Sequence, residues 1–217
     1  MKRKCFLQLI IPFLLSMMFF SSASATLTAK QAEDWAMAKG QEILNILAEP
    51  TSKQKYEALD KILTQDINLD YAAKFVVGKY WRTMSEEQQE KYVPLFKRYA
   101  AALYKNFPLN IPNGAVEFKI EKTVQDKDII NIFGRIYVTE LNNINQQNND
   151  GFKVQFLLEE NNNRPQVRDL KVEESSLLLT FRERFYKMIH QDNDDEIDWF
   201  LEDFETLVID TENKRQM

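Results

Sequence analysis

The sequence predicts an α+β fold in which helices pack on a curved, four-stranded antiparallel sheet, with additional helices at the N- and C-terminal ends. Three observations support this class. Apolar residues recur every third or fourth position between residues 28 and 107. They alternate with polar residues between 116 and 173, and the helical spacing returns after residue 177. Helices, then a block of strands, then helices are typical of an α+β domain.

The N-terminal part is expected to form four helices. The first spans residues 28–48 and ends before Pro50, and Thr51 or Ser52 can cap the second. The third, over residues 69–81, is apolar nearly all round and therefore needs two packing neighbours. The fourth begins with a capping box at Ser85 and runs to about residue 107, with Pro94 expected to bend it.

Four strands and two helices are expected to follow. Each strand is apolar on one face only, which is typical of an antiparallel sheet half covered by helices. The strands centre on residues 116–121, 130–138, 152–158 and 169–173, with polar turns at 142–151 and 161–163. The last two helices carry their apolar residues over 178–188 and 197–208.

Residues 1–25 read as an export signal. Lys2-Arg3-Lys4 precede an apolar run from Cys5 to Phe20, and Ala23-Ser24-Ala25 form a small-residue cleavage site. We therefore expect a signal peptide over 1–25 and a single domain over 26–217 that is exported to the periplasm. An uncleaved anchor is the alternative, although the run is shorter than the about 20 residues that a spanning helix needs.

Charge and composition narrow the function classes. The expected signal holds three of the 28 basic residues and none of the 33 acidic ones, which leaves a net charge of −8. Such a surface is a poor partner for nucleic acid or a bare anionic bilayer. The expected domain has no cysteine and one histidine, His190, so it lacks a nucleophile–base set and a zinc ligand set. We expect that the protein is a monomer and not an enzyme, and that it binds no metal and no cofactor other than its cargo.

The residues offer a large apolar surface, which we interpret as a binding pocket between the strand face and the helix faces. An ordinary closed core is the alternative, because a core and a lipid pocket use the same side chains. The candidate lipid-binding residues on helices are Tyr71, Phe75, Val76, Trp81, Phe96, Tyr99, Leu103, Phe181 and Phe185. Those on strands are Phe118, Ile120, Ile130, Ile132, Phe152, Val154, Phe156, Leu170 and Val172.

Two stretches resemble the MlaC family of periplasmic phospholipid-binding proteins, also called the toluene-tolerance family. Residues 69–104 contain "FVVGKYWRTMSEEQQEKYVPLFKRYAAALY", and 167–185 read "VRDLKVEESSLLLTFRERF". Glu174 departs from the pattern because the family usually has glycine there, and Arg168 stands where tyrosine is usual. The resemblance implies a cone related to nuclear-transport-factor-like (NTF2-like) domains, with diacyl lipid tails between sheet and helices.

The resemblance also implies partners: an inner-membrane ABC transporter with a ring-forming lipid-transfer subunit, and an outer-membrane lipoprotein associated with porins. The implied function is a shuttle of phospholipid between these complexes. A carrier of a fatty acid, sterol-like lipid or quinone, or a ligand-free periplasmic adaptor, remains an alternative. Because no buried cation is identified in the pocket wall, we expect an outward headgroup and little headgroup selectivity, with Arg82, Arg98 and Arg182 as candidates at the mouth.

Overall fold

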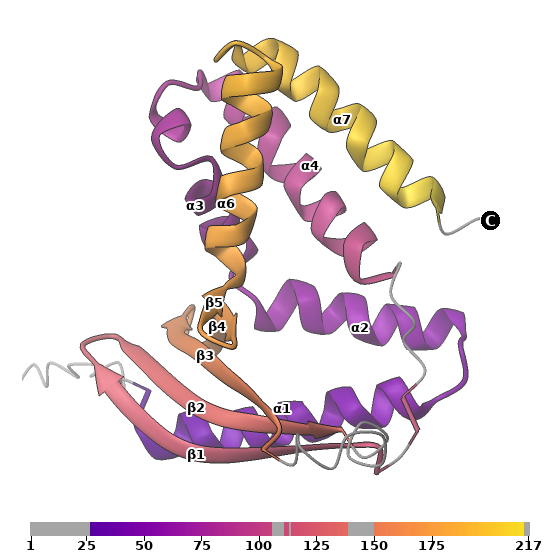
Figure 1. Ribbon diagram of the computed structural model, residues 1–217, viewed down its shortest axis with the longest axis vertical. Coiled ribbons are helices and arrows are strands. Elements are labelled where there is room, and N and C mark those ends of the chain that lie inside the picture. The colour runs from indigo at the N-terminus through magenta and orange to yellow at the C-terminus, as the bar shows by residue number, and fades with distance from the viewer. Residues whose placement is uncertain (1–26, 106–110, 113, 139–149, 215–217) are drawn as a thin grey trace, which may run out of the picture.

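The computed structural model describes residues 27–105, 111–112, 114–138 and 150–214 (Figure 1). Its helices are α1 (Ala29–Ala48), α2 (Lys53–Asp66), α3 (Leu69–Val77), α4 (Glu86–Lys105), α6 (Leu177–Lys187) and α7 (Ile197–Asn213). Its strands are β1 (Val116–Asp126), β2 (Ile129–Val138), β3 (Phe152–Asn161), β4 (Arg164–Val172) and β5 (Ser175–Ser176). The α+β class is confirmed. The expected signal peptide lies outside the described residues, as does most of the expected turn at 142–151.

The helix starts follow the capping signals of the sequence. Thr28 and Gln31 form a capping box at α1, and the Ser52 side chain accepts a hydrogen bond from the Lys55 backbone at the start of α2. Ser85 and Gln88 make the reciprocal pair before α4, and Pro94 lies inside that helix. At α3 the Asn68 side chain accepts from the Tyr71 backbone, so all four N-terminal helices begin where a side chain satisfies a free N–H group.

Helix α3 ends earlier than expected. It stops at Val77, and residues Gly78–Arg82 continue as a 3₁₀ helix. Gly78 has a φ of 51°, and a Cβ at this position would run into the side chains of Arg182 and Tyr186 on α6. The Lys79 backbone donates to the Tyr186 hydroxyl at 3.0 Å. Glycine is therefore required where the end of α3 approaches α6 this closely.

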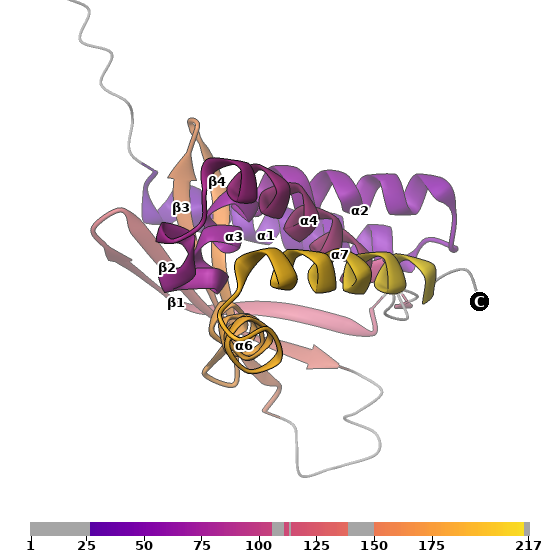
Figure 2. The same ribbon diagram turned by 90° about the horizontal axis from the view of Figure 1, so that it is seen from above.

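The sheet is a five-stranded antiparallel meander in the order β1-β2-β3-β4-β5. The four expected strands are present, and the two-residue strand β5 was not expected. Register shifts between Ile120 and Lys122 and between Leu157 and Leu158 mark bulges, which increase the curl of a sheet. Helix α1 lies along β1 and β2, whereas α6 leads away from the sheet edge toward α7 (Figures 1 and 2).

The buried apolar residues form two separate clusters. The larger is built from α3, α4, α6, α7 and the segments beside them, and six aromatic rings fill its centre: Tyr92, Phe96, Tyr99, Phe185, Phe200 and Phe204. The smaller joins α1 to the sheet through Leu27, Ala32, Ala36, Ile130, Ile132 and Leu158. Helix α6 therefore connects a helical bundle to a sheet layer with its own apolar contacts.

The turn between β4 and β5 keeps its tight shape without glycine. Glu173 and Glu174 have φ values of 47° and 70°, in the left-handed region that disfavours side chains with a Cβ. We expect Glu174→Gly to raise the free energy of unfolding by about 1 kcal/mol, measured by urea denaturation. Glu173→Gly is the matched control: its carboxylate accepts from the Lys153 backbone at 2.8 Å, so loss of that bond should offset the gain. Equal gains in both variants would contradict this account.

Candidate apolar binding site

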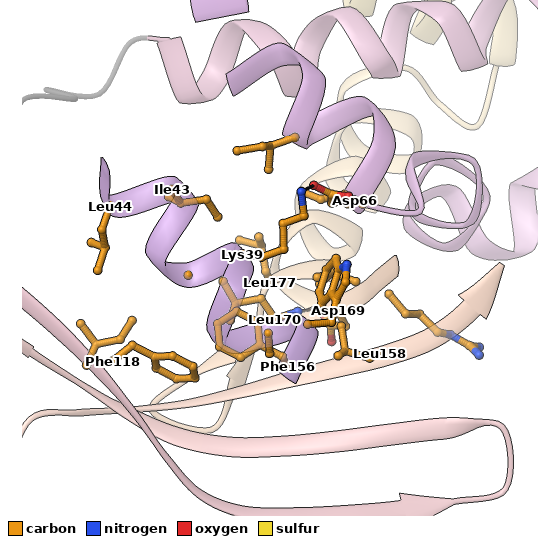
Figure 3. A pocket seen from close by; sticks show the side chains of 18 of the residues that line it. Lys39, Ile43, Leu44, Asp66, Phe118, Phe156, Leu158, Asp169, Leu170 and Leu177 are labelled. Atoms are coloured by element: carbon orange, nitrogen blue, oxygen red, sulfur yellow. Dashed lines mark hydrogen bonds and ion pairs between the residues drawn. The ribbon is translucent and has the colours of Figure 1, made fainter. Parts of the chain in front are cut away.

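A cavity of about 360 Å³ lies between α1 and the inner face of the sheet (Figure 3). Its walls come from α1, the end of α2, one residue of α3, strands β1 to β4 and the start of α6. The polar atoms of the lining residues point away from the hollow, so carbon atoms make nearly all of its surface. The volume falls in the lower part of the range of about 300–1,000 Å³ that small-ligand sites occupy.

Small residues on α1 leave this space open. Gly40 lines the cavity, and a Cβ added there would have one neighbour within 4 Å, the Phe118 ring at 3.6 Å. Phe118 meets Phe156 edge-to-face with ring centroids 5.6 Å apart. In β2, a Cβ at Gly134 would lie 2.6 Å from the Phe118 ring, so glycine lets that ring lie over the strand. Two glycines therefore fix Phe118 and keep the hollow beside it.

Asp169, at the cavity wall, has its carboxylate fully engaged. It accepts hydrogen bonds from the backbone of Leu170 at 2.9 Å and of Leu178 at 3.2 Å, and from the Ser176 hydroxyl at 2.6 Å. Two of these donors lie at the N-terminal end of α6, where a negative charge is favoured. Asp169 therefore ties α6 to β4 and offers little to a ligand.

Two partly exposed cations, Lys39 and Arg168, line the cavity. The Arg168 guanidinium lies 4.0 Å over the Tyr71 ring and 3.3 Å from Glu159. The Lys39 ammonium lies 3.0 Å from Asp66 and 2.7 Å from Glu42. Burial opposes the charged state of Lys39, but these carboxylates outweigh it and raise the lysine pKa.

The structure brings three of the candidate lipid-binding residues to the cavity: Phe118, Phe156 and Leu170. The other strand candidates do not line it: Ile120, Ile130 and Ile132 belong to the α1–sheet cluster, and Val154 is buried. Phe152 and Val172 are exposed, at 42% and 44%.

The helical candidates do not reach the cavity. Tyr71, Phe75, Val76, Trp81, Phe96, Tyr99, Leu103, Phe181 and Phe185 belong to the helical bundle, where they pack on one another. Although Arg168 of β4 lies over the Tyr71 ring, these faces do not form the cavity wall with the strand face as expected, because α1 covers the sheet there. The proposed mouth cations are also elsewhere: Arg98 pairs with Glu212 at 2.7 Å, Arg182 lies over the Phe75 ring at 4.6 Å, and neither they nor Arg82 line the cavity.

Sequence reasoning missed the contribution of α1 to the site. Ala36, Lys39, Gly40, Ile43 and Leu44 all line the cavity. The signal that could have found them is the series Ala32, Ala36 and Gly40, three small residues four positions apart on one helix face. Such a face lets a helix approach a sheet closely and leaves room where the series ends in glycine.

A tyrosine–aspartate–histidine chain lies in the helical bundle, away from the cavity. The Tyr80 hydroxyl donates to Asp195, and Asp195 lies 2.9 Å from His190 Nδ1. Burial, together with the Asp195 bond, raises the pKa of Tyr80 to about 12, so this hydroxyl stays protonated at neutral pH. Among the described residues, no three or more histidine, cysteine, aspartate or glutamate side chains are grouped to hold a metal ion.

The fold and cavity define a class: an α+β domain with an apolar hollow between a curled sheet and a covering helix. The sequence model of the MlaC protein family matches residues 38–206. The chain therefore belongs to the MlaC family.

Two known proteins are similar to this chain. The "intermembrane phospholipid transport system binding protein MlaC" of Haemophilus influenzae is 31% identical over 78 residues, a match that spans 36% of either chain. A phospholipid-binding protein from Ralstonia solanacearum, solved in complex with a phospholipid, superposes with a TM-score of 0.62 at 16% identity, over 82% of this chain and 98% of that one. The latter likeness shows the fold. In the part of this chain that the structure covers, no helix is long and apolar enough to cross a membrane.

Proposed function

We propose that this protein is a periplasmic carrier that holds phospholipid acyl chains in the cavity beneath α1. The observation that carries the proposal is the lining of that cavity by carbon atoms from α1, β1 to β4 and α6. Membership of the MlaC family, and the phospholipid bound by the Ralstonia solanacearum protein of the same fold, support it. The family relation also supports the wider role, a shuttle between outer-membrane and inner-membrane transport complexes.

The energetics of acyl chains support handover between docked partners. Removing one methylene from water is worth about 0.8 kcal/mol. Two tails with roughly 30 methylenes therefore contribute a gross term on the order of 20 kcal/mol, and release into water would be very slow. A carrier must pass the tails directly into another apolar slot. This reasoning favours docking to protein partners at both membranes, here the implied lipid-transfer ring and lipoprotein–porin complex.

The chemistry of the cavity favours binding over catalysis. Its ionisable lining groups are engaged with one another or with backbone N–H groups, as in the Asp169 and Lys39–Asp66 contacts. The Tyr80–Asp195–His190 chain does not line it. We therefore propose a transport protein without catalytic activity.

The decisive variant fills the hollow from α1. In Gly40→Leu the new side chain enters open space, and replacing a helical glycine stabilises the helix by about 0.5–1 kcal/mol, so the fold should persist. We expect the purified protein to carry phospholipid and Gly40→Leu to carry less than half as much per polypeptide. The measurement is solvent extraction followed by phosphate analysis and mass spectrometry, after purification without detergent.

Ala38→Leu is the matched control, because Ala38 is an exposed residue on the same helix and does not line the cavity. It should leave lipid content unchanged. Equal lipid in both variants would place the cargo elsewhere. A different extracted amphiphile, such as a fatty acid or quinone, would replace phospholipid as the cargo, and a protein with no extractable lipid would favour the adaptor.

A further inference from the structure

Lys39 lies at an edge of the cavity where the apolar lining meets a group of charged side chains. Its stem lines the hollow, while its ammonium bridges from α1 to Asp66 at the end of α2 (Figure 3). The Lys39 side chain is 27% exposed and that of Glu42 is 47% exposed, so these groups meet solvent. A long side chain with a buried aliphatic stem and a solvated ammonium is suited to a position between acyl tails and a polar headgroup.

Lys39 also has bonding capacity for a phosphate oxygen. An ammonium has three N–H donors, and the contacts to Asp66 and Glu42 use two of them. The Glu42 contact is a partly exposed pair within one helix, a kind worth little and easily exchanged. Arg168, the other lining cation, lies against Tyr71 and Glu159. Lys39 can therefore bind a phosphate oxygen while it keeps its contact with Asp66.

The charges around Lys39 do not balance. One ammonium faces two carboxylates, so this edge carries a local charge of −1. A headgroup with only a phosphate would add a second negative charge. A headgroup with a phosphate and an ammonium can place the phosphate on Lys39 and the ammonium near Glu42 or Asp66.

On the basis of the proposed carrier function, we infer that Lys39, Asp66 and Glu42 form a headgroup-selecting edge that favours zwitterionic aminophospholipids over anionic phospholipids. This differs from the expectation of little headgroup selectivity, which considered buried cations and not a partly exposed one at the cavity edge.

The test is a competition between two lipids. The full chain is incubated with vesicles of equimolar phosphatidylethanolamine and phosphatidylglycerol and re-isolated, and its bound lipids are quantified by mass spectrometry. We expect a preference of about threefold for phosphatidylethanolamine, the scale that partly exposed charge pairs support, and a smaller preference at high salt. Inorganic phosphate should leave this ratio the same as sodium chloride of equal ionic strength does, since the free ion has no tails to hold it in place.

Two variants should move the ratio in opposite directions. Glu42→Gln removes the local excess of negative charge and should bring the ratio toward one. Lys39→Gln leaves two carboxylates and should raise the ratio further. Lys53→Gln and Glu57→Gln are the controls, because this exposed pair on α2 does not line the cavity and should leave the ratio unchanged.

Each other result has a definite meaning. A wild-type ratio near one, a shift of both variants in the same direction, or a greater loss of the preference in inorganic phosphate than in sodium chloride of equal ionic strength would overturn the headgroup assignment. In those cases lipid is still bound and the carrier function stands. Absence of phospholipid from every sample would instead refute the carrier function itself.

Discussion

Phe185→Ala should lower the free energy of unfolding by about 3–5 kcal/mol, the largest effect expected in this chain. Phe185 is fully buried at the centre of the helical bundle. Its ring centroid lies 5.1 Å from that of Phe204 and 5.9 Å from that of Phe96. Truncation removes these ring contacts and leaves a void that the packed helices cannot close. Urea denaturation followed by circular dichroism measures the loss.

A variant of the same residue also tests which of the two apolar clusters holds the lipid. Phe185 does not line the cavity, so the milder variant Phe185→Leu should lose stability and keep its lipid content. Trp199→Ala is the control for stability, since Trp199 is 56% exposed on α7 and should change it by less than about 0.5 kcal/mol. A folded Phe185→Leu protein that purifies without lipid would mean that the bundle, and not the α1 layer, holds the cargo.

Lys55→Met should cost about 2 kcal/mol of unfolding free energy. Lys55 is 1% exposed, and its ammonium donates to the carbonyl oxygens of Leu47 at 2.8 Å and Glu49 at 2.7 Å. These carbonyls end α1, where a helix has unpaired acceptors and a negative dipole end. Methionine fills similar space but donates no hydrogen bond, so the end of α1 loses its cap. Thermal and urea unfolding report the change.

Lys53 provides the comparison for Lys55. It lies two residues earlier at the start of α2, and its side chain is 86% exposed beside Glu57. Lys53→Met should therefore change stability by less than about 0.5 kcal/mol. Similar losses in the two variants would show that the methionine substitution, and not the loss of the α1 cap, is responsible.

Local signals predicted most elements of this fold. The helical spacing from residue 28, the cap at Thr51 or Ser52, the capping box at Ser85 and the alternation along four strands lie close to the observed boundaries. The signal for the early end of α3 was present in Gly78, a residue that readily adopts positive φ. The strand Ser175–Ser176 is too short for any alternation to reveal.

Periodicity could not show which element each apolar face packs against. An apolar stripe shows that a helix buries one side, but it does not show against what. The aromatic stripes of α4 and α6 therefore suggested a pocket with the sheet, whereas they pack with α7 in the bundle. Ala36 and Gly40 of α1 shape the site by leaving space, and small residues give a weaker sequence signal for a pocket than large rings do.

The hollow beneath α1 links cargo to folding. Atoms around a void lack packing partners on one side, and core voids cost about 24 cal/mol for each Å³. For about 360 Å³ the penalty is on the order of several kcal/mol, even when water entering from the open side reduces it. An apolar ligand that fills the cavity restores those missing contacts. Emptied, the molecule should thus melt at a lower temperature than when filled, so that unloading makes the carrier itself more fragile.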